Sequence, residues 1–183
     1  IESQKIGNYV NSADALIERN AQLKSMAPQI AANLPRLSEA VLDDQYTVVE
    51  QQFAFADILV SALRAGLSNV ATFTLDDLGT RYDGVVQDTI ELHEIGHNKA
   101  LKGMPALEVR SHLRTHHMKV VNKLVEDLKA SPEGSGNMFD NTVIFYLPEN
   151  GEAHHSHGIE VPFIILAGDK VKLNMARRRY IRL

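Results

Sequence analysis

Three short apolar runs, separated by long amphipathic stretches, limit most strongly how this chain can fold. They cover residues 70–75, 142–147 and 162–167. Apolar side chains predominate in all three runs and are continuous from 143 to 147, which is typical of strands buried on both faces of a sheet. With helices between them, they predict an α/β fold of three layers, in which helices flank a mostly parallel sheet.

The helices are indicated by apolar residues that recur at three- and four-residue spacing over residues 2–25, about 47–67 and 106–130. A chain of 183 residues is long enough for one domain with its own core. We therefore expect a single α/β domain over residues 1–183, with an N-terminal helical segment at residues 1–35.

Composition narrows the class of protein. Apolar residues make up 44% and charged residues 23%, with a net charge of −4, so the balance indicates a globular chain and gives no sign of nucleic-acid binding. No apolar run reaches the roughly 18–20 residues of a transmembrane helix. Without cysteine, disulfides, thiolate metal sites and a cysteine nucleophile are excluded. Because the chain begins on Ile1 and stops after "RRRYIRL", we expect that segments are missing at both ends.

A first histidine cluster lies in "LHEIGHNKALKG", which contains the H-E-x-x-H pattern of zinc peptidases. On a helix, His93 and His97 would share one face and could hold one metal ion, with Glu94 as general base. The longer peptidase pattern fails, because Ala100 stands where glycine is required and Gly103 where histidine is required. A zinc peptidase is therefore only the minor alternative.

A second cluster follows the run at 142–147 directly, in "ENGEAHHSHGIE". Its imidazoles and carboxylates are usual ligands of zinc and other divalent metals. Asp76 and Asp77 follow the run at 70–75 in the same way. Because ligands in α/β sheets sit beyond the carboxyl ends of the strands, we expect these polar groups to converge there. The metal-ligand candidates are His93, His97, Glu149, His154 and His157, with Asp76 and Asp77 as second candidates.

Two other polar groups have simpler interpretations. His112, His116 and His117 lie on the predicted helix at 106–130, where we expect a polar face with one histidine hydrogen-bonded beneath the sheet. The basic run "RRRYIRL" could bind phosphate or an acidic partner. Such a run is more often solvated, which is the interpretation adopted here.

A resemblance covers residues 45–170. The ordered blocks "QQFAFADILVSALRAGLSNVATFTL", "HEIGHN" and "HHMKVVNKLVEDLKASPEGSGNMFDNTVIFYLPENGEAHHSHGIEVPFIILAGD" resemble secreted bacterial proteins of unknown function whose core is similar to alkaline phosphatases and sulfatases. The resemblance implies the C-terminal part of an alkaline-phosphatase-like fold, two metal ions at the carboxyl edge of the sheet, and a periplasmic or cell-surface location.

The chain departs from that pattern at two metal positions and at the nucleophile. Glu149 and Asn150 stand where the wider superfamily has an Asp-His pair, and Glu94 stands in place of an Asp before His97. No segment matches the one that carries the nucleophile. Two hypotheses therefore remain open: a metal-dependent hydrolase, or a non-catalytic subunit that assembles with other protein chains. The replacement of the Asp-His pair favours the second, and the density of histidine favours the first.

Overall fold

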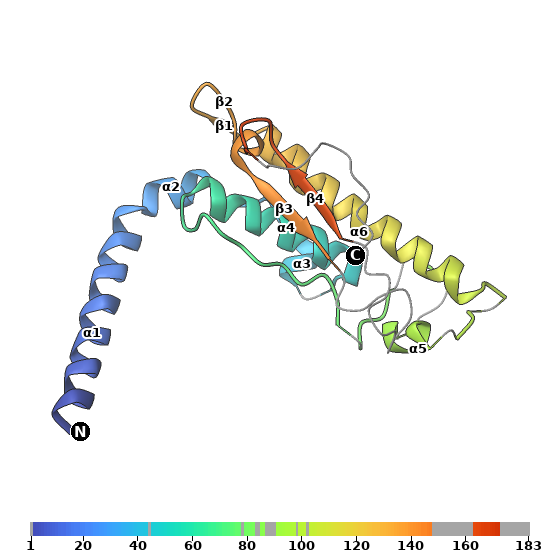
Figure 1. The fold of residues 1–183 in the computed structure, drawn as a ribbon, viewed down its shortest axis with the longest axis horizontal. Coiled ribbons are helices and arrows are strands. Elements are labelled where there is room, and N and C mark those ends of the chain that lie inside the picture. Colours follow the sequence, from blue (N-terminus) through green and yellow to red (C-terminus); the bar gives the residue numbers. More distant parts are fainter. Residues whose placement is uncertain are drawn as a thin grey trace.

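The fold is dominated by helices, as a computed structural model shows (Figure 1). The structure describes residues 2–43, 45–77, 79–82, 85–86, 91–97, 99–101, 103–147 and 163–172. The helices are α1 (Glu2–Ser25), α2 (Ala27–Ala32), α3 (Glu39–Leu42), α4 (Val48–Arg64), α5 (Leu92–Gly96) and α6 (Ala106–Lys129), with a short 3-10 helix η1 (Met138–Asn141). The strands are β1 (Pro132–Glu133), β2 (Gly136–Asn137), β3 (Val143–Tyr146) and β4 (Ile164–Ala167).

The three long helices confirm the periodicity of the sequence. Thr47 caps α4 through a reciprocal capping box, because its hydroxyl accepts from the Glu50 amide and the Glu50 carboxylate accepts from the Thr47 amide. Gly66 then ends the helix region with a φ of 70°, a left-handed conformation that glycine adopts without strain. Pro105 precedes α6, where its missing amide hydrogen leaves no helical hydrogen bond unmade.

Helix α6 organises the core, because its two halves bury different partners. Its first half packs Val109 and Leu113 against Tyr82 and Ile95, so that α5 lies on this end of the helix. Its second half packs against α4 in a cluster that also takes in the extended segment 70–76. That cluster comprises Ala56, Val60, Val120 and Leu124, with Phe53, Leu59, Phe73, Leu75 and Ile144 at its margin.

The fold-class prediction of a three-layer, mostly parallel sheet of alkaline-phosphatase-like type is wrong. The described strands form two separate two-stranded sheets, β1–β2 and β3–β4, and both are antiparallel. In the second sheet, Val143 lies opposite Ala167 and Tyr146 opposite Ile164. The prediction failed because a continuous apolar run indicates burial, whereas the partner of a strand and its direction depend on distant parts of the chain.

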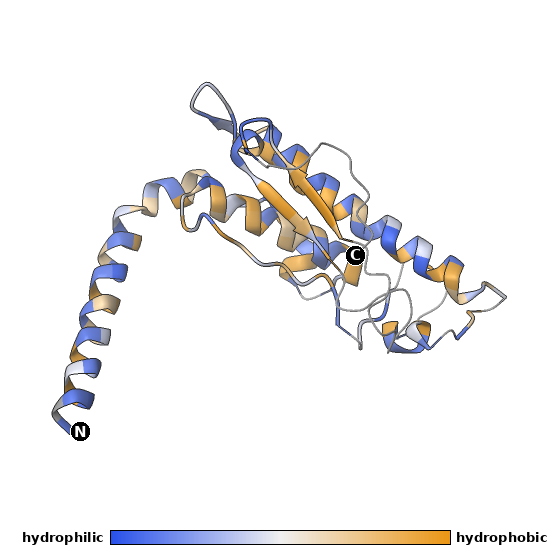
Figure 2. Cartoon of the chain, in the orientation of Figure 1, coloured by the Kyte–Doolittle hydropathy of each residue, from blue (hydrophilic) through white to orange (hydrophobic). Residues whose placement is uncertain are grey.

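The run at 70–75 is extended but forms no ladder with any described strand. Phe73 and Leu75 instead pack directly on the α4–α6 core. Burial of β3 on both faces is also wrong, because Ile144 contacts the core whereas Phe145 is 57% exposed. Figure 2 shows the apolar colouring of β3 and β4.

Candidate functional site

A hydrogen-bonded network of polar side chains lies where segment 70–76, α4, α6 and β3 meet. Two adjacent histidines of α6, His116 and His117, are 5% and 9% exposed. They fall between Leu113 and Val120 on the buried side of the helix, which is why imidazoles enter the core here. The expectation of a polar helix face is therefore wrong for these two histidines, whereas His112 is exposed as expected.

Gln52 of α4 joins three members of the network, because its side chain is hydrogen-bonded to Leu75, Tyr82 and His116. Its side-chain nitrogen donates to the Leu75 carbonyl (2.6 Å) and to the Tyr82 hydroxyl (3.1 Å). Its carbonyl oxygen is therefore left to accept from Nε2 of His116 at 2.5 Å. This contact requires a proton on Nε2 of His116. Burial and the nearby charges of His117 and Lys119 lower the pKa of His116, which favours the neutral ring over the imidazolium.

Asp76, Tyr82 and His117 form the centre of the network. The Tyr82 hydroxyl donates to Oδ2 of Asp76 at 2.6 Å. Nε2 of His117 lies 2.6 Å from the same hydroxyl and 3.1 Å from the same carboxylate oxygen. Since the hydroxyl proton is given to Asp76, the contact with His117 requires a proton on Nε2 of that ring.

The charge states of this centre follow from its surroundings. Burial raises the pKa of Asp76, but hydrogen bonds from His117 and Tyr82 outweigh it and leave that pKa below its ordinary value. Burial, with the Asp76 carboxylate beside it, raises the pKa of Tyr82 far above its ordinary value. At neutral pH the centre therefore holds an ionised carboxylate and a protonated phenol.

Tyr146, the last residue of β3, completes the network. Its hydroxyl lies 3.1 Å from Nδ1 of His117. Asp76 stands at the carboxyl end of segment 70–76 and Tyr146 at the carboxyl end of β3, so both ends reach the same imidazole ring. Asp76, one of the two second candidates, thus lies in a cluster with His117, a histidine that was not among the candidate ligands. The signal that could have identified His117 is its position in the middle of the apolar stripe of a helix.

Asp77, the other second candidate, does not join the network. Its carboxylate accepts from the Gly79 amide and the Thr80 hydroxyl, both at 2.9 Å, which closes a local turn. The candidates Glu149, His154 and His157 lie outside the described residues. Their predicted convergence with Asp76 therefore stays a prediction.

The first four residues of the H-E-x-x-H motif lie in α5, a single helical turn, and His97 is the residue that caps its carboxyl end. Nε2 of His93 and Nε2 of His97 are 2.9 Å apart, so the two rings share one face as predicted. Glu94 forms an ion pair with Lys99, and the hydrogen bond from Lys99 lowers the pKa of the Glu94 carboxyl group. An ion-paired carboxylate of lowered pKa is a weaker general base, which argues against the peptidase alternative.

Within the described part of the chain, side chains that could bind a metal ion come together only in pairs. No group of three or more histidine and carboxylate side chains could hold an ion there. Two pairs have suitable atoms: Asp76 with His117, and His93 with His97. Ligands of a tetrahedral zinc ion at about 2.0–2.1 Å from the metal stand about 3.3 Å from each other. The Asp76–His117 pair, at 3.1 Å, is close to that separation, and the His93–His97 pair, at 2.9 Å, is shorter.

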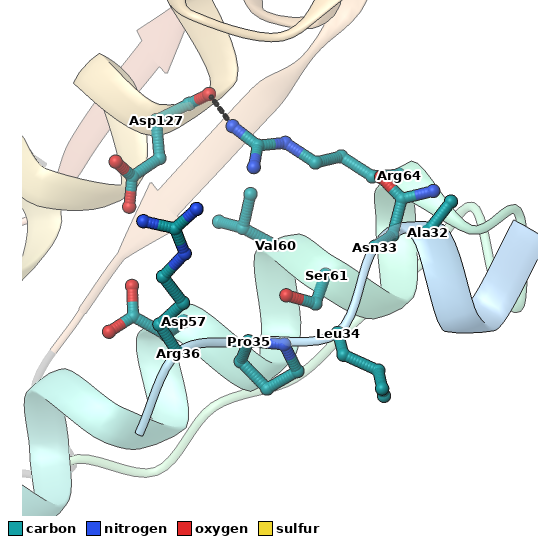
Figure 3. Close-up of a pocket in the computed structure, with 10 residues that line it drawn as sticks. All are labelled: Ala32, Asn33, Leu34, Pro35, Arg36, Asp57, Val60, Ser61, Arg64 and Asp127. Carbon is teal, nitrogen blue, oxygen red and sulfur yellow. Dashed lines mark hydrogen bonds between the residues drawn. The ribbon is translucent and has the colours of Figure 1, made fainter. Parts of the chain in front are cut away.

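One hollow among the described residues lies away from this network (Figure 3). It has a volume of about 390 Å³, and residues of the 32–36 segment, α4 and α6 line it. Arg64 donates to the Asp127 carbonyl there at 3.0 Å. Lys123 pairs with Asp57 at 2.5 Å and Asp127 at 2.7 Å, so the two carboxylates of this wall are already partnered.

Comparison with protein-family models, with curated proteins and with solved structures gives no match for this chain. The resemblance drawn from the sequence therefore stays a prediction. None of the described helices is both long and apolar enough to cross a membrane.

Proposed function

We propose that this chain is a divalent-metal-binding protein with a hydrolytic site built around Asp76 and His117. One observation carries the proposal: Oδ2 of Asp76 and Nε2 of His117 lie 3.1 Å apart, a separation that one metal ion could bridge once Nε2 has lost its proton. A carboxylate and an imidazole are the ligand types that zinc and similar ions prefer.

The hydrogen bond at the far side of the His117 ring supports this assignment. Metal-binding histidines usually donate their second ring nitrogen to an oxygen, which fixes the ring and its tautomer. Tyr146 supplies such an oxygen 3.1 Å from Nδ1. A proton on Nδ1 instead of Nε2 would free Nε2 as a ligand while Nδ1 donates to Tyr146.

Further ligands are needed, because catalytic zinc sites commonly have three protein ligands. Glu149, His154 and His157 follow Tyr146 after three, eight and eleven positions. They are therefore the proposed source of the third ligand. A bound ion would polarise a phosphate or sulfate oxygen and activate water. The hydrogen bonds of Tyr82 and Tyr146 would keep Asp76 ionised and hold the His117 ring in one orientation.

Calorimetric titration of the chain with Zn²⁺ tests the proposal. Asp76→Asn and His117→Gln should each weaken binding by more than the roughly 10- to 100-fold that loss of a ligand's hydrogen-bonding partner costs, since each removes a ligand itself. His112→Gln is the matched control, because His112 lies exposed on the same helix. Thermal unfolding of each variant separates lost ligation from lost folding. Unchanged Zn²⁺ affinity in folded Asp76→Asn and His117→Gln would rule the site out.

Hydrolysis of p-nitrophenyl phosphate and p-nitrophenyl sulfate tests the second half of the proposal. Zn²⁺-dependent release of p-nitrophenol, lost in His117→Gln and kept in His112→Gln, is the expected result. Metal binding without hydrolysis of either ester would leave a metal site and contradict the hydrolase.

A second candidate function, a non-catalytic assembly subunit, is favoured by the outer face of the β3–β4 sheet. Phe145 and Phe163 stack there with ring centroids 5.9 Å apart, and they are 57% and 55% exposed. Exposed aromatic pairs of this kind mark surfaces that bind another protein. A photo-crosslinking residue at position 145 should attach one specific protein chain, whereas the same residue at exposed Leu107 should not. Equal labelling from both positions would contradict this candidate.

A further inference from the structure

Helix α1 extends from the body as an arm, and its apolar side chains are not covered by the described part of the chain (Figure 1). Every residue from 4 to 22 is exposed. The large apolar side chains among them are Ile6, Tyr9, Val10, Leu16 and Ile17, with exposed fractions between 53% and 76%. Most of the stability of a helix in a protein comes from packing its apolar face, so a helix of this length calls for a partner.

The spacing of the stripe indicates which partner fits. Ile6, Val10, Ala13 and Ile17 follow one another at intervals of four, three and four residues, which is the repeat of helices that pair in a coiled coil. The pattern is symmetric about its midpoint between residues 11 and 12. In an antiparallel pair of identical helices, Ile6 would therefore face Ile17 of the second copy, and Val10 would face Ala13.

The charges of α1 favour the antiparallel direction. Lys24 lies on the same stripe, seven residues after Ile17. In a parallel pair in register, Lys24 would face Lys24 of the other copy, which places like charges in the seam. In the antiparallel pair it lies beyond the end of the partner helix. Lys5, Glu18 and Arg19 lie off the stripe in either case.

The attachment of α1 to the body leaves the stripe accessible. Arg19 donates to the Leu67 carbonyl at 3.3 Å, and this side chain projects from the opposite side of the helix to the stripe. The body lies at the carboxyl end of α1 (Figure 1). Antiparallel pairing would thus put the two bodies at opposite ends of the helix pair, where they do not compete for space.

From these observations we propose that the chain forms a homodimer through α1, with the α1 helices of two copies packed antiparallel along this stripe. The pairing is independent of the metal site and of the outer face of the β3–β4 sheet. Its failure would leave both proposed functions untouched.

Light scattering during size-exclusion chromatography tests the dimer. The chain should elute with twice its mass of 20.3 kDa at tens of micromolar. Ile17→Asp should raise the dimer dissociation constant at least 10-fold, because it places a charge in the seam. Ala15→Asp introduces the same residue on the opposite face of α1 and should leave the dimer intact. A monomeric chain, or a dimer that Ile17→Asp does not weaken, would overturn the proposal.

Disulfide trapping tests the direction in which the two α1 helices pair. Because the chain has no cysteine of its own, only the introduced cysteines can form cross-links. Val10→Cys and Ala13→Cys chains, one lengthened by a tag so that the products separate by size, are mixed and oxidised. Antiparallel pairing predicts that the mixed 10-to-13 product exceeds both self-linked products several-fold. Predominance of self-linked products, or no cross-link at all in a mixture that is dimeric, would overturn the antiparallel arrangement. Circular dichroism of each variant checks that α1 remains helical.

Discussion

At the scale of residues, Tyr82 is the most constrained side chain of the network. It is fully buried, and its hydroxyl contacts Gln52, Asp76 and His117 at 2.6–3.1 Å. Its phenol both satisfies the Asp76 carboxylate and fixes the protonated nitrogen of His117. Sequence reasoning did not select Tyr82, because a tyrosine between two short irregular segments carries no periodic signal.

Removal of the Tyr82 hydroxyl should therefore destabilise the fold. Tyr82→Phe leaves Asp76 and Gln52 each one hydrogen bond short in a buried place, which costs about 1–3 kcal/mol of unfolding free energy. Urea denaturation at pH 7 measures the change. Tyr9→Phe is the control, since Tyr9 is 76% exposed. Equal stability of Tyr82→Phe and the unchanged protein would show that the network contributes nothing.

His116 should make stability depend on pH. Its pKa is lowered in the fold, chiefly by burial, so the unfolded chain takes up the proton first. Neutral His116 therefore contributes its full share of the unfolding free energy above the unfolded pKa of about 6.5. This stabilisation is lost as the pH falls through the lower pKa of the folded state. The unfolding free energy should thus decline from pH 7 toward pH 5, and less steeply in His116→Gln. An identical slope in that variant, with His112→Gln as reference, would contradict the assignment.

At the scale of elements, the interface between α4 and α6 carries the body. Leu124 packs there with Ala56, Val60 and Val120. Leu124→Ala should cost about 2–5 kcal/mol of unfolding free energy, because it opens a cavity in a packed interface. Leu107→Ala on the same helix should change stability by less than about 0.5 kcal/mol, since Leu107 is 66% exposed. Chemical denaturation measures the unfolding free energy of both variants. Similar losses of stability in the two would contradict the placement of the core between α4 and α6.

The elements also show what the sequence can and cannot predict. The bounds of α1, α4 and α6 were predictable within a few residues, because a helix is fixed by local spacing and by caps such as Thr47. The runs that contain β3 and β4 were recognised for the same local reason. Their antiparallel pairing was not, because register and direction are set by contacts between segments far apart in the chain.

At the scale of the whole molecule, the candidate site was only partly predictable. Asp76 was selected because it follows an apolar run, and the structure places it beside a histidine. His117 was missed because a buried histidine and a solvated one look alike in a sequence until the apolar stripe around it is given weight. Glu149, His154 and His157 lie outside the described residues, so their part in the site stays a prediction.

Location of a bound metal ion by X-ray diffraction tests whether Asp76 and His117 are its ligands. Crystals of the chain grown with Zn²⁺ and measured at the zinc absorption edge would give an anomalous difference map. We expect a peak about 2.0–2.2 Å from both Nε2 of His117 and Oδ2 of Asp76. A peak only between His93 and His97, or no peak beside His117 at saturating Zn²⁺, would contradict it.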